Sequence, residues 1–112
     1  MKKKKELNDQ ALGLIAHRFR LLAEPMRLKI LHTLSDQEMS VTELVAATGA
    51  NQANISKHLG ILLDAGIVSR RKEGLTANYQ IIDETIFELC DVVCSRLQSQ
   101  FESRKSVLAG IF

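Results

Sequence analysis

The sequence of 112 residues predicts a mainly helical fold that carries one β-hairpin. Apolar residues recur three or four positions apart over most of the chain, which is the period of a helix with one buried face. This period gives way to that of a strand only between residues 67 and 82. A short helical segment, a turn that contains Gly49 and a longer helical segment also follow one another, as in a helix-turn-helix. We therefore expect helices, then a strand pair, then a last helix.

The length and composition are those of one ordinary globular domain. Apolar residues make up 46% of the chain and charged residues 25%, and 112 residues leave no room for a second independent core. No apolar stretch approaches the roughly 20 residues that span a bilayer, and the charged N-terminus does not resemble a secretion signal. We expect a cytoplasmic protein with no membrane partner. Residues 1–8, with the basic run Lys2 to Lys5, are expected to form a flexible arm, and residues 9–112 the domain.

The first predicted helix covers Asp9 to Leu22, and the second covers Pro25 to about Ser35. Glu24 separates them, because a residue that precedes proline avoids the helical backbone conformation. Pro25 suits the first position of a helix, where an N–H group would have had no partner. The apolar residues that define the two helical periods are Leu12, Ile15, Ala16, Phe19, Leu22, Leu28, Leu31 and Leu34.

The next two helices form the predicted helix-turn-helix. Ser40 and Glu43 have the spacing of a capping box, in which two side chains satisfy the exposed N–H groups at the start of a helix. Gly49 can take the left-handed conformation that ends this short helix. The longer helix is expected from about Gln52 to Ala65, and its inward-facing residues are expected to be Ile55, Leu59, Leu62 and Leu63.

Two strands, Ile67 to Arg71 and Ala77 to Ile82, are expected to form a hairpin with a charged tip. Asp83 then caps a last helix from Glu84 to about Val107. A helix of this length cannot bury its apolar stripe against so small a domain, so we expect a homodimer joined through the first and last helices. The stripe consists of Ile86, Leu89, Cys90, Val93, Leu97 and Phe101.

The longer helix of the pair carries the polar side chains that DNA recognition needs. The amides of Gln52 and Asn54 can form bidentate contacts with adenine edges in the major groove. The net charge of only +2 does not by itself imply nucleic-acid binding, so the position of the charges matters more. The basic hairpin can contact phosphates as a wing, or it can be a charged strand edge that prevents aggregation. The candidate DNA contacts are Gln52, Asn54, Ser56, Lys57, His58, Arg70, Arg71 and Lys72.

Several motifs together point to a known family. Phe19 to Leu31 contains Ala-Glu-Pro-x-Arg-Leu, and Gln52 to Leu59 contains Ser-x-His-Leu. With Leu62 to Val68 and the basic hairpin that ends at Tyr79, these motifs resemble the ArsR/SmtB family over roughly residues 11–82. The resemblance implies a winged-helix homodimer that represses transcription at an inverted-repeat operator and releases this double-stranded DNA when it senses an inducer. It implies no cofactor for DNA binding.

The sequence disfavours an enzyme and a standard zinc, cadmium or lead sensor. It lacks a Gly-rich phosphate loop and a nucleophile–base set. Two ligand positions of the family's metal sensors are also missing, because Thr42 to Ala47 contains no cysteine and the last helix contains no histidine.

Cys90 and Cys94 are the remaining candidates for sensing. Their spacing of four places both thiols on one helix face, with Cβ atoms roughly 5–6 Å apart. A disulfide needs about 4 Å between Cβ atoms and would be strained in an intact helix. The two thiolates can instead hold a soft metal or metalloid, join through a longer sulfur chain, or pair across the dimer axis.

Three alternatives stay open. Some family members sense persulfides with a cysteine in the second helix, at the position of His32, so the resemblance suggests a mixed nitrogen–sulfur site of His32, Cys90 and Cys94. The two cysteines can instead be packing residues of a constitutive repressor, since cysteine is a common buried residue. The winged helix can also be a scaffold for protein contacts.

Overall fold

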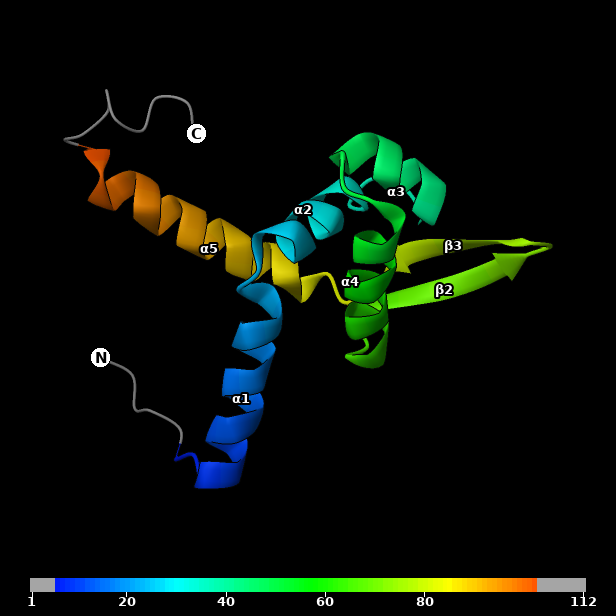
Figure 1. Cartoon of the computed structure of the whole chain (residues 1–112). Coiled ribbons are helices and arrows are strands. Elements are labelled where there is room, and N and C mark those ends of the chain that lie inside the picture. The colour runs from blue at the N-terminus through cyan, green and yellow to red at the C-terminus, as the bar shows by residue number, and fades with distance from the viewer. Residues whose placement is uncertain (1–5, 103–112) are drawn as a thin grey trace. The chain divides into compact units, whose positions relative to one another are not determined.

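The computed structural model describes residues 6–102, and the chain divides into two units (Figure 1). The first unit ends at Ile82 and the second begins at Asp83. The basic run at Lys2 to Lys5 and positions 103–107 of the predicted last helix lie outside the described residues. Within residues 6–102, no helix combines the length and the apolar character that crossing a membrane requires.

The first two helices begin where the sequence predicts them. Helix α1 spans Asp9–Leu22, and the Asn8 side chain before it accepts a hydrogen bond from the Ala11 N–H group at 2.8 Å. Helix α2 spans Pro25–Thr33, with proline at its first position and Glu24 as its N-cap. The Glu24 carboxylate accepts hydrogen bonds from the first N–H groups of α2, so the residue that breaks the chain direction also starts the next helix.

The helix-turn-helix consists of α3, Val41–Thr48, and α4, Gln52–Asp64. The capping box at the start of α3 is confirmed: Ser40 Oγ accepts from the Glu43 N–H group at 3.2 Å, and Glu43 Oε1 accepts from the Ser40 N–H group at 2.8 Å. Gly49 ends α3 with φ 78°, in the left-handed region that favours glycine.

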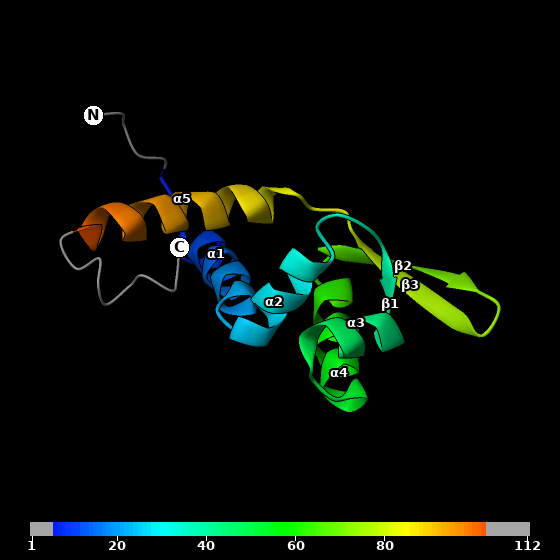
Figure 2. The same cartoon turned by 90° about the horizontal axis from the view of Figure 1, so that it is seen from above.

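The core of the first unit lies among α2, α3 and α4, which contact one another, and it extends to the base of the hairpin (Figures 1 and 2). Each helix contributes buried aliphatic side chains, and those of α4 recur three or four residues apart, so that one face of this helix is removed from water. The fully buried side chains of this unit are Ile30, Leu31, Leu44, Ile55, Leu59, Leu62, Ile67 and Val68.

The wing is a three-stranded antiparallel sheet with the order β1-β3-β2. The predicted hairpin is formed by β2, Val68–Glu73, and β3, Thr76–Ile81. Both strands extend further toward the tip than predicted, since a two-residue turn with Gly74 at φ 62° joins them. The third strand, β1 at Met39–Ser40, pairs with β3 and was not predicted, because two residues are too few to show an alternating pattern.

The second unit contains α5, Thr85–Gln100. The N-cap residue is Glu84 and not the predicted Asp83, and it forms no side-chain cap bond because the helix begins one residue later than expected. The Asp83 Oδ1 atom accepts a hydrogen bond from the Thr85 N–H group at 3.1 Å. The helix ends at Gln100, before the predicted end near Val107. Most of its residues are exposed within the single chain, including the apolar side chains Leu89, Val93 and Leu97.

Candidate nucleic-acid interface

Helix α4 has one buried and one exposed face, and the exposed face carries most of the predicted DNA contacts. Its buried residues are Ile55, His58, Leu59 and Leu62, which are three or four positions apart. Gln52, Ser56 and Lys57 are exposed, and Asn54 is half-buried at the edge of the exposed face. A helix that is anchored by one face in this way presents the opposite face in a fixed direction.

The start of α4 is held by a turn that also involves α2 and α3. The Thr48 hydroxyl donates to the Leu44 carbonyl at 2.7 Å and accepts from the Ala50 N–H group at 3.3 Å. The Lys29 ammonium of α2 donates to the Thr48 carbonyl at 3.1 Å, and Asn51 Oδ1 accepts from the Asn54 N–H group at 2.8 Å. These bonds fix the direction of α4 relative to α3. Lys29 and Thr48 were not predicted from the sequence, because the bond that joins them links two helices across 19 positions.

His58 does not lie with the exposed residues, contrary to expectation. Only 5% of its surface is exposed, and its Nδ1 atom lies 3.2 Å from the Arg27 guanidinium. The reason is the helical period: His58 follows Ile55 by three positions and therefore falls on the same buried face. Burial lowers the pKa of His58, the nearby Arg27 and Lys57 lower it further, and the Glu24 carboxylate acts in the opposite direction.

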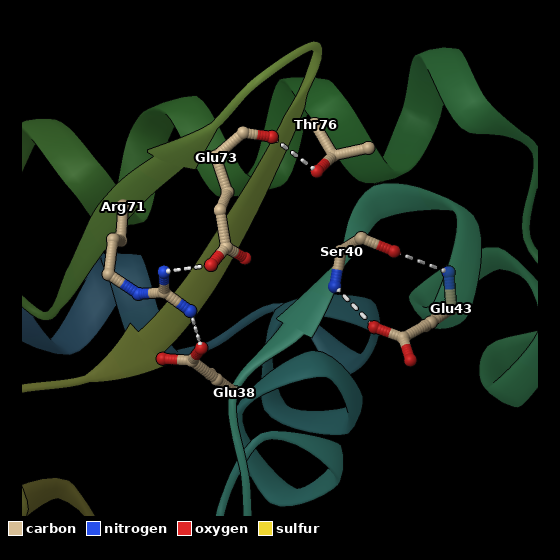
Figure 3. Close-up of polar contacts among 6 residues, drawn as sticks. All are labelled: Glu38, Ser40, Glu43, Arg71, Glu73 and Thr76. Atoms are coloured by element: carbon tan, nitrogen blue, oxygen red, sulfur yellow. Dashed lines mark hydrogen bonds and ion pairs between the residues drawn. The ribbon is translucent and has the colours of Figure 1, made fainter.

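The three basic residues of the wing have different surroundings, and those of Arg71 are shown in Figure 3. The Arg71 guanidinium forms ion pairs with Glu38, and with Glu73 at 3.1 Å, and these carboxylates raise the pKa of Arg71. Arg70 and Lys72 are exposed and form no ion pair within residues 6–102. The structure thus brings Arg71 together with two acidic residues and leaves the charges of Arg70 and Lys72 exposed.

The candidate sensing residues belong to different units. His32 is exposed on α2, whereas Cys90 and Cys94 lie one turn apart on α5, the former half-buried and the latter exposed. Burial raises the pKa of Cys90, and Asp91 and Cys94 add to this effect. No group of three or more His, Cys, Asp or Glu side chains within residues 6–102 could hold a metal ion. The mixed site of His32, Cys90 and Cys94 stays a prediction.

Comparisons with known proteins bear on the helix-turn-helix directly. Residues 24–70 match the family described as "Bacterial regulatory protein, arsR family". The chain is 36% identical over 83 residues to the HTH-type transcriptional regulator KmtR of Mycobacterium tuberculosis, a match that covers 74% of this chain and 64% of KmtR. It is also 36% identical over 94 residues to the HTH-type transcriptional regulator Rv0081 of the same organism, covering 83% of this chain and 82% of that protein.

Solved structures agree with the fold. The crystal structure of Rv0081 has a TM-score of 0.76 at 34% sequence identity and covers 87% of this chain and 98% of that one. The winged helix-turn-helix domain Mb0332 from Mycobacterium bovis, described as homodimeric and DNA-binding, has a TM-score of 0.69 at 32% identity, covering 85% of this chain and 91% of that one. The predicted winged-helix fold class is therefore confirmed, with the short strand β1 as an addition.

The conclusion follows from the sequence match through the helix-turn-helix, the identity with relatives over most of the chain, and the fold that they share. The family consists of transcriptional regulators, which agrees with the expectation that the chain is not an enzyme. The chain belongs to the ArsR family of DNA-binding transcriptional regulators.

Proposed function

We propose that two copies of this chain repress transcription at an inverted-repeat operator, with one α4 helix of each copy in the major groove, and that an inducer acts at the cysteines of α5. The observation that carries the DNA-binding part is the division of α4 into a buried face and an exposed polar face. Residues at the start of a recognition helix contact base edges in helix-turn-helix proteins. Gln52 and Asn54 lie in the first turn of α4, and Ser56 and Lys57 follow one turn later.

The wing supplies contacts to the DNA backbone in this proposal. Arg70 and Lys72 alternate along β2, so both side chains project from the same face of the hairpin. Their exposed charges can neutralise phosphates without first breaking an ion pair. Arg71 projects from the opposite face toward Glu38 and Glu73, and we assign it a role in holding the hairpin to β1.

Exposed apolar faces support the homodimer. Helix α1 exposes Leu12, Ile15 and Phe19 at spacings of three and four, and Phe19 alone has 55% of its surface exposed. Helix α5 exposes Leu89, Val93 and Leu97 at spacings of four. Contiguous apolar surface of this kind marks an interaction site in a monomer. A second copy is the proposed partner, as in the homodimeric relative Mb0332.

The sensing part of the proposal rests on the two thiols of α5. Cys94 is exposed and therefore accessible to a small reagent, whereas burial of Cys90 favours its neutral thiol. We infer that Cys94 is the first of the two thiols to react with a persulfide-type or other oxidant, or the first to ligate a soft metalloid. Cys90 is then the second thiol to react or to ligate. The alternative is a constitutive repressor in which Cys90 and Cys94 pack against neighbouring residues.

The first prediction concerns base recognition by Gln52. An inverted-repeat duplex is selected from a random library, with half-sites expected about one helical turn apart. Replacing Gln52 by Ala removes a bidentate amide and should reduce discrimination between this duplex and single-base variants by about 1–3 kcal/mol at one position. Gln37→Ala, an exposed loop residue between α2 and β1, is the matched control. Equal affinity of the wild type for selected and scrambled duplexes would contradict the proposed readout.

The second prediction concerns the charges of the wing. Arg70→Ala should weaken binding to all duplexes alike and reduce the slope of log affinity against log salt by about 0.9, as expected for one lost phosphate contact. Arg71→Ala should leave this slope unchanged, because the two carboxylates already neutralise that charge. Fluorescence anisotropy over a salt series measures both variants. A larger change of slope for Arg71→Ala than for Arg70→Ala would reverse the assignment.

The third prediction concerns the apolar face of α1. Phe19→Glu places a charge within the proposed subunit interface and should shift the protein from dimer to monomer, since an unpartnered buried charge is costly. Sedimentation equilibrium measures the change, and operator affinity should fall with it. Leu75→Glu makes the same chemical change at a fully exposed residue of the wing tip and should leave the dimer intact. A wild type that sediments as a monomer would refute the interface.

The fourth prediction concerns the thiols. At pH 7.5, iodoacetamide should modify Cys94 faster than Cys90, because alkylation requires the thiolate and burial raises the pKa of Cys90. Mass spectrometry of peptides from a timed reaction measures the two rates. The double variant Cys90→Ser, Cys94→Ser should still bind the selected duplex but should no longer release it on exposure to polysulfide, arsenite or cadmium.

The controls for this experiment are the two single variants, which separate a one-thiol response from a two-thiol response. Ser is close to Cys in size, so a loss of release without a loss of binding assigns the thiols to sensing. If the double variant releases DNA as the wild type does, the cysteines are packing residues and the constitutive alternative replaces the sensing proposal.

A further inference from the structure

Arg27 joins three helices of the first unit through one guanidinium group. Its Nε atom donates to the Leu21 carbonyl at 2.7 Å, and Nη2 lies 3.5 Å from the Arg20 carbonyl. Both carbonyls belong to the last turn of α1, and that of Arg20 also accepts a hydrogen bond from the Ala23 N–H group at 3.2 Å. The remaining nitrogen, Nη1, lies 3.2 Å from Nδ1 of His58 on α4. A side chain of α2 therefore connects the end of α1 to the buried face of α4.

The chemistry of this contact requires a neutral histidine. A guanidinium group has only donors, so a hydrogen bond from Arg27 requires that Nδ1 of His58 is an acceptor. The imidazole proton then lies on Nε2. A protonated imidazole would carry donors at both nitrogens and would face the Arg27 cation with no hydrogen bond between them.

The charged groups around His58 come from two elements. Glu24 and Arg27 belong to the N-terminal end of α2, and Lys57 is the neighbour of His58 on α4. The Glu24 carboxylate, whose Oε1 atom accepts hydrogen bonds from the N–H groups of Met26 and Arg27, opposes the two cations and acts on the pKa of His58 more strongly than either one alone. Arg27 and Lys57 therefore favour the neutral form of the buried imidazole, and Glu24 favours its protonated form.

We propose that Arg27 and neutral His58 are positioning residues, which hold α4 against the end of α1 in the orientation that binds the operator, and that protonation of His58 releases this contact. The proposal rests on the proposed use of α4 at DNA. It adds a link between that helix and α1, whose exposed face Leu12, Ile15 and Phe19 is the proposed subunit interface. Neither residue contacts DNA in this proposal.

The sign of the pH effect follows from burial. Because burial lowers the pKa of His58, the unfolded chain binds a proton at higher pH than the folded protein does. The contribution of the pair to stability is complete above the ordinary histidine pKa of about 6.5. It is lost progressively as the pH falls from there toward the lower pKa of the folded state. Operator affinity should therefore decline on acidification, beginning below neutral pH.

Two substitutions of His58 test separately whether the side chain must accept a hydrogen bond from Arg27 and whether it must be able to bind a proton. In His58→Asn, Oδ1 can accept from Arg27 near the position of Nδ1 but does not titrate. In His58→Leu, the site stays filled but the acceptor is lost. The exposed His17, to which no role is assigned, provides the control His17→Asn. The affinity of each variant for the selected duplex is measured by fluorescence anisotropy between pH 8 and pH 5.5, and circular dichroism verifies folding.

The expected results differ for each variant. His58→Asn should bind within about threefold of the wild type at pH 8 and lose less affinity on acidification. His58→Leu should be about tenfold weaker than the wild type at pH 8, the cost of a lost charged hydrogen bond, and this difference should shrink as the pH falls. The control His17→Asn should keep the wild-type pH profile. Superimposable profiles of the wild type and His58→Asn would overturn the proposal.

A measurement without DNA tests the contact itself. Nitrogen-15 NMR of the wild-type imidazoles at pH 8 should show His58 with its proton on Nε2, and Arg27→Met should shift the Nδ1 resonance. A proton on Nδ1 would overturn the proposal. If the protein binds no duplex specifically, the proposed function fails, and the NMR result still decides whether the Arg27–His58 contact exists.

Discussion

The burial of one face of α4 is the constraint on which the rest of the structure depends. Ile55, Leu59 and Leu62 are removed from water against α2 and α3, and this burial sets the rotation of α4 about its own axis. The turn around Thr48 then sets its direction, because α2 and α3 both contribute hydrogen bonds there. The polar face of α4 can be presented to DNA bases only when both the rotation and the direction of the helix are fixed. In this chain, buried side chains fix the rotation and hydrogen bonds fix the direction.

Helices and their caps were predictable from the sequence, because the information for each is local. The bonds of Ser40 and Glu43, the break at Glu24 and the left-handed Gly49 all join residues within a few positions, and each occurs as expected. Strand β1 was not predictable, since it exists only as a partner of β3, about 40 positions later. The buried position of His58 was predictable from the helical period alone. The sequence prediction placed it at the DNA instead, because the possible role of its imidazole in DNA contact was given more weight than that period.

The wing shows why charge in a sequence does not translate directly into a DNA contact. Three consecutive basic residues look equivalent in the sequence, yet strand alternation sends Arg71 to the face opposite Arg70 and Lys72. On that face lies Glu38, which the chain brings close from 33 positions away. Exposed ion pairs of this kind add little to stability, but they remove a cation from the set that can attract phosphates. The effective charge of the wing is therefore lower than its composition indicates.

Regulation requires that an event at one surface changes the orientation of α4, and the first unit contains a short physical route for this. The exposed apolar face of α1 and the carbonyls that receive Arg27 belong to the same rigid helix, and Arg27 is bonded in turn to the buried face of α4. If α1 shifts at a subunit interface, either Arg27 moves with it or the hydrogen bonds of Arg27 break. Since the contact is only as strong as a few hydrogen bonds, it is suited to a population shift of a few kcal/mol, which is the range in which ligands change DNA affinity.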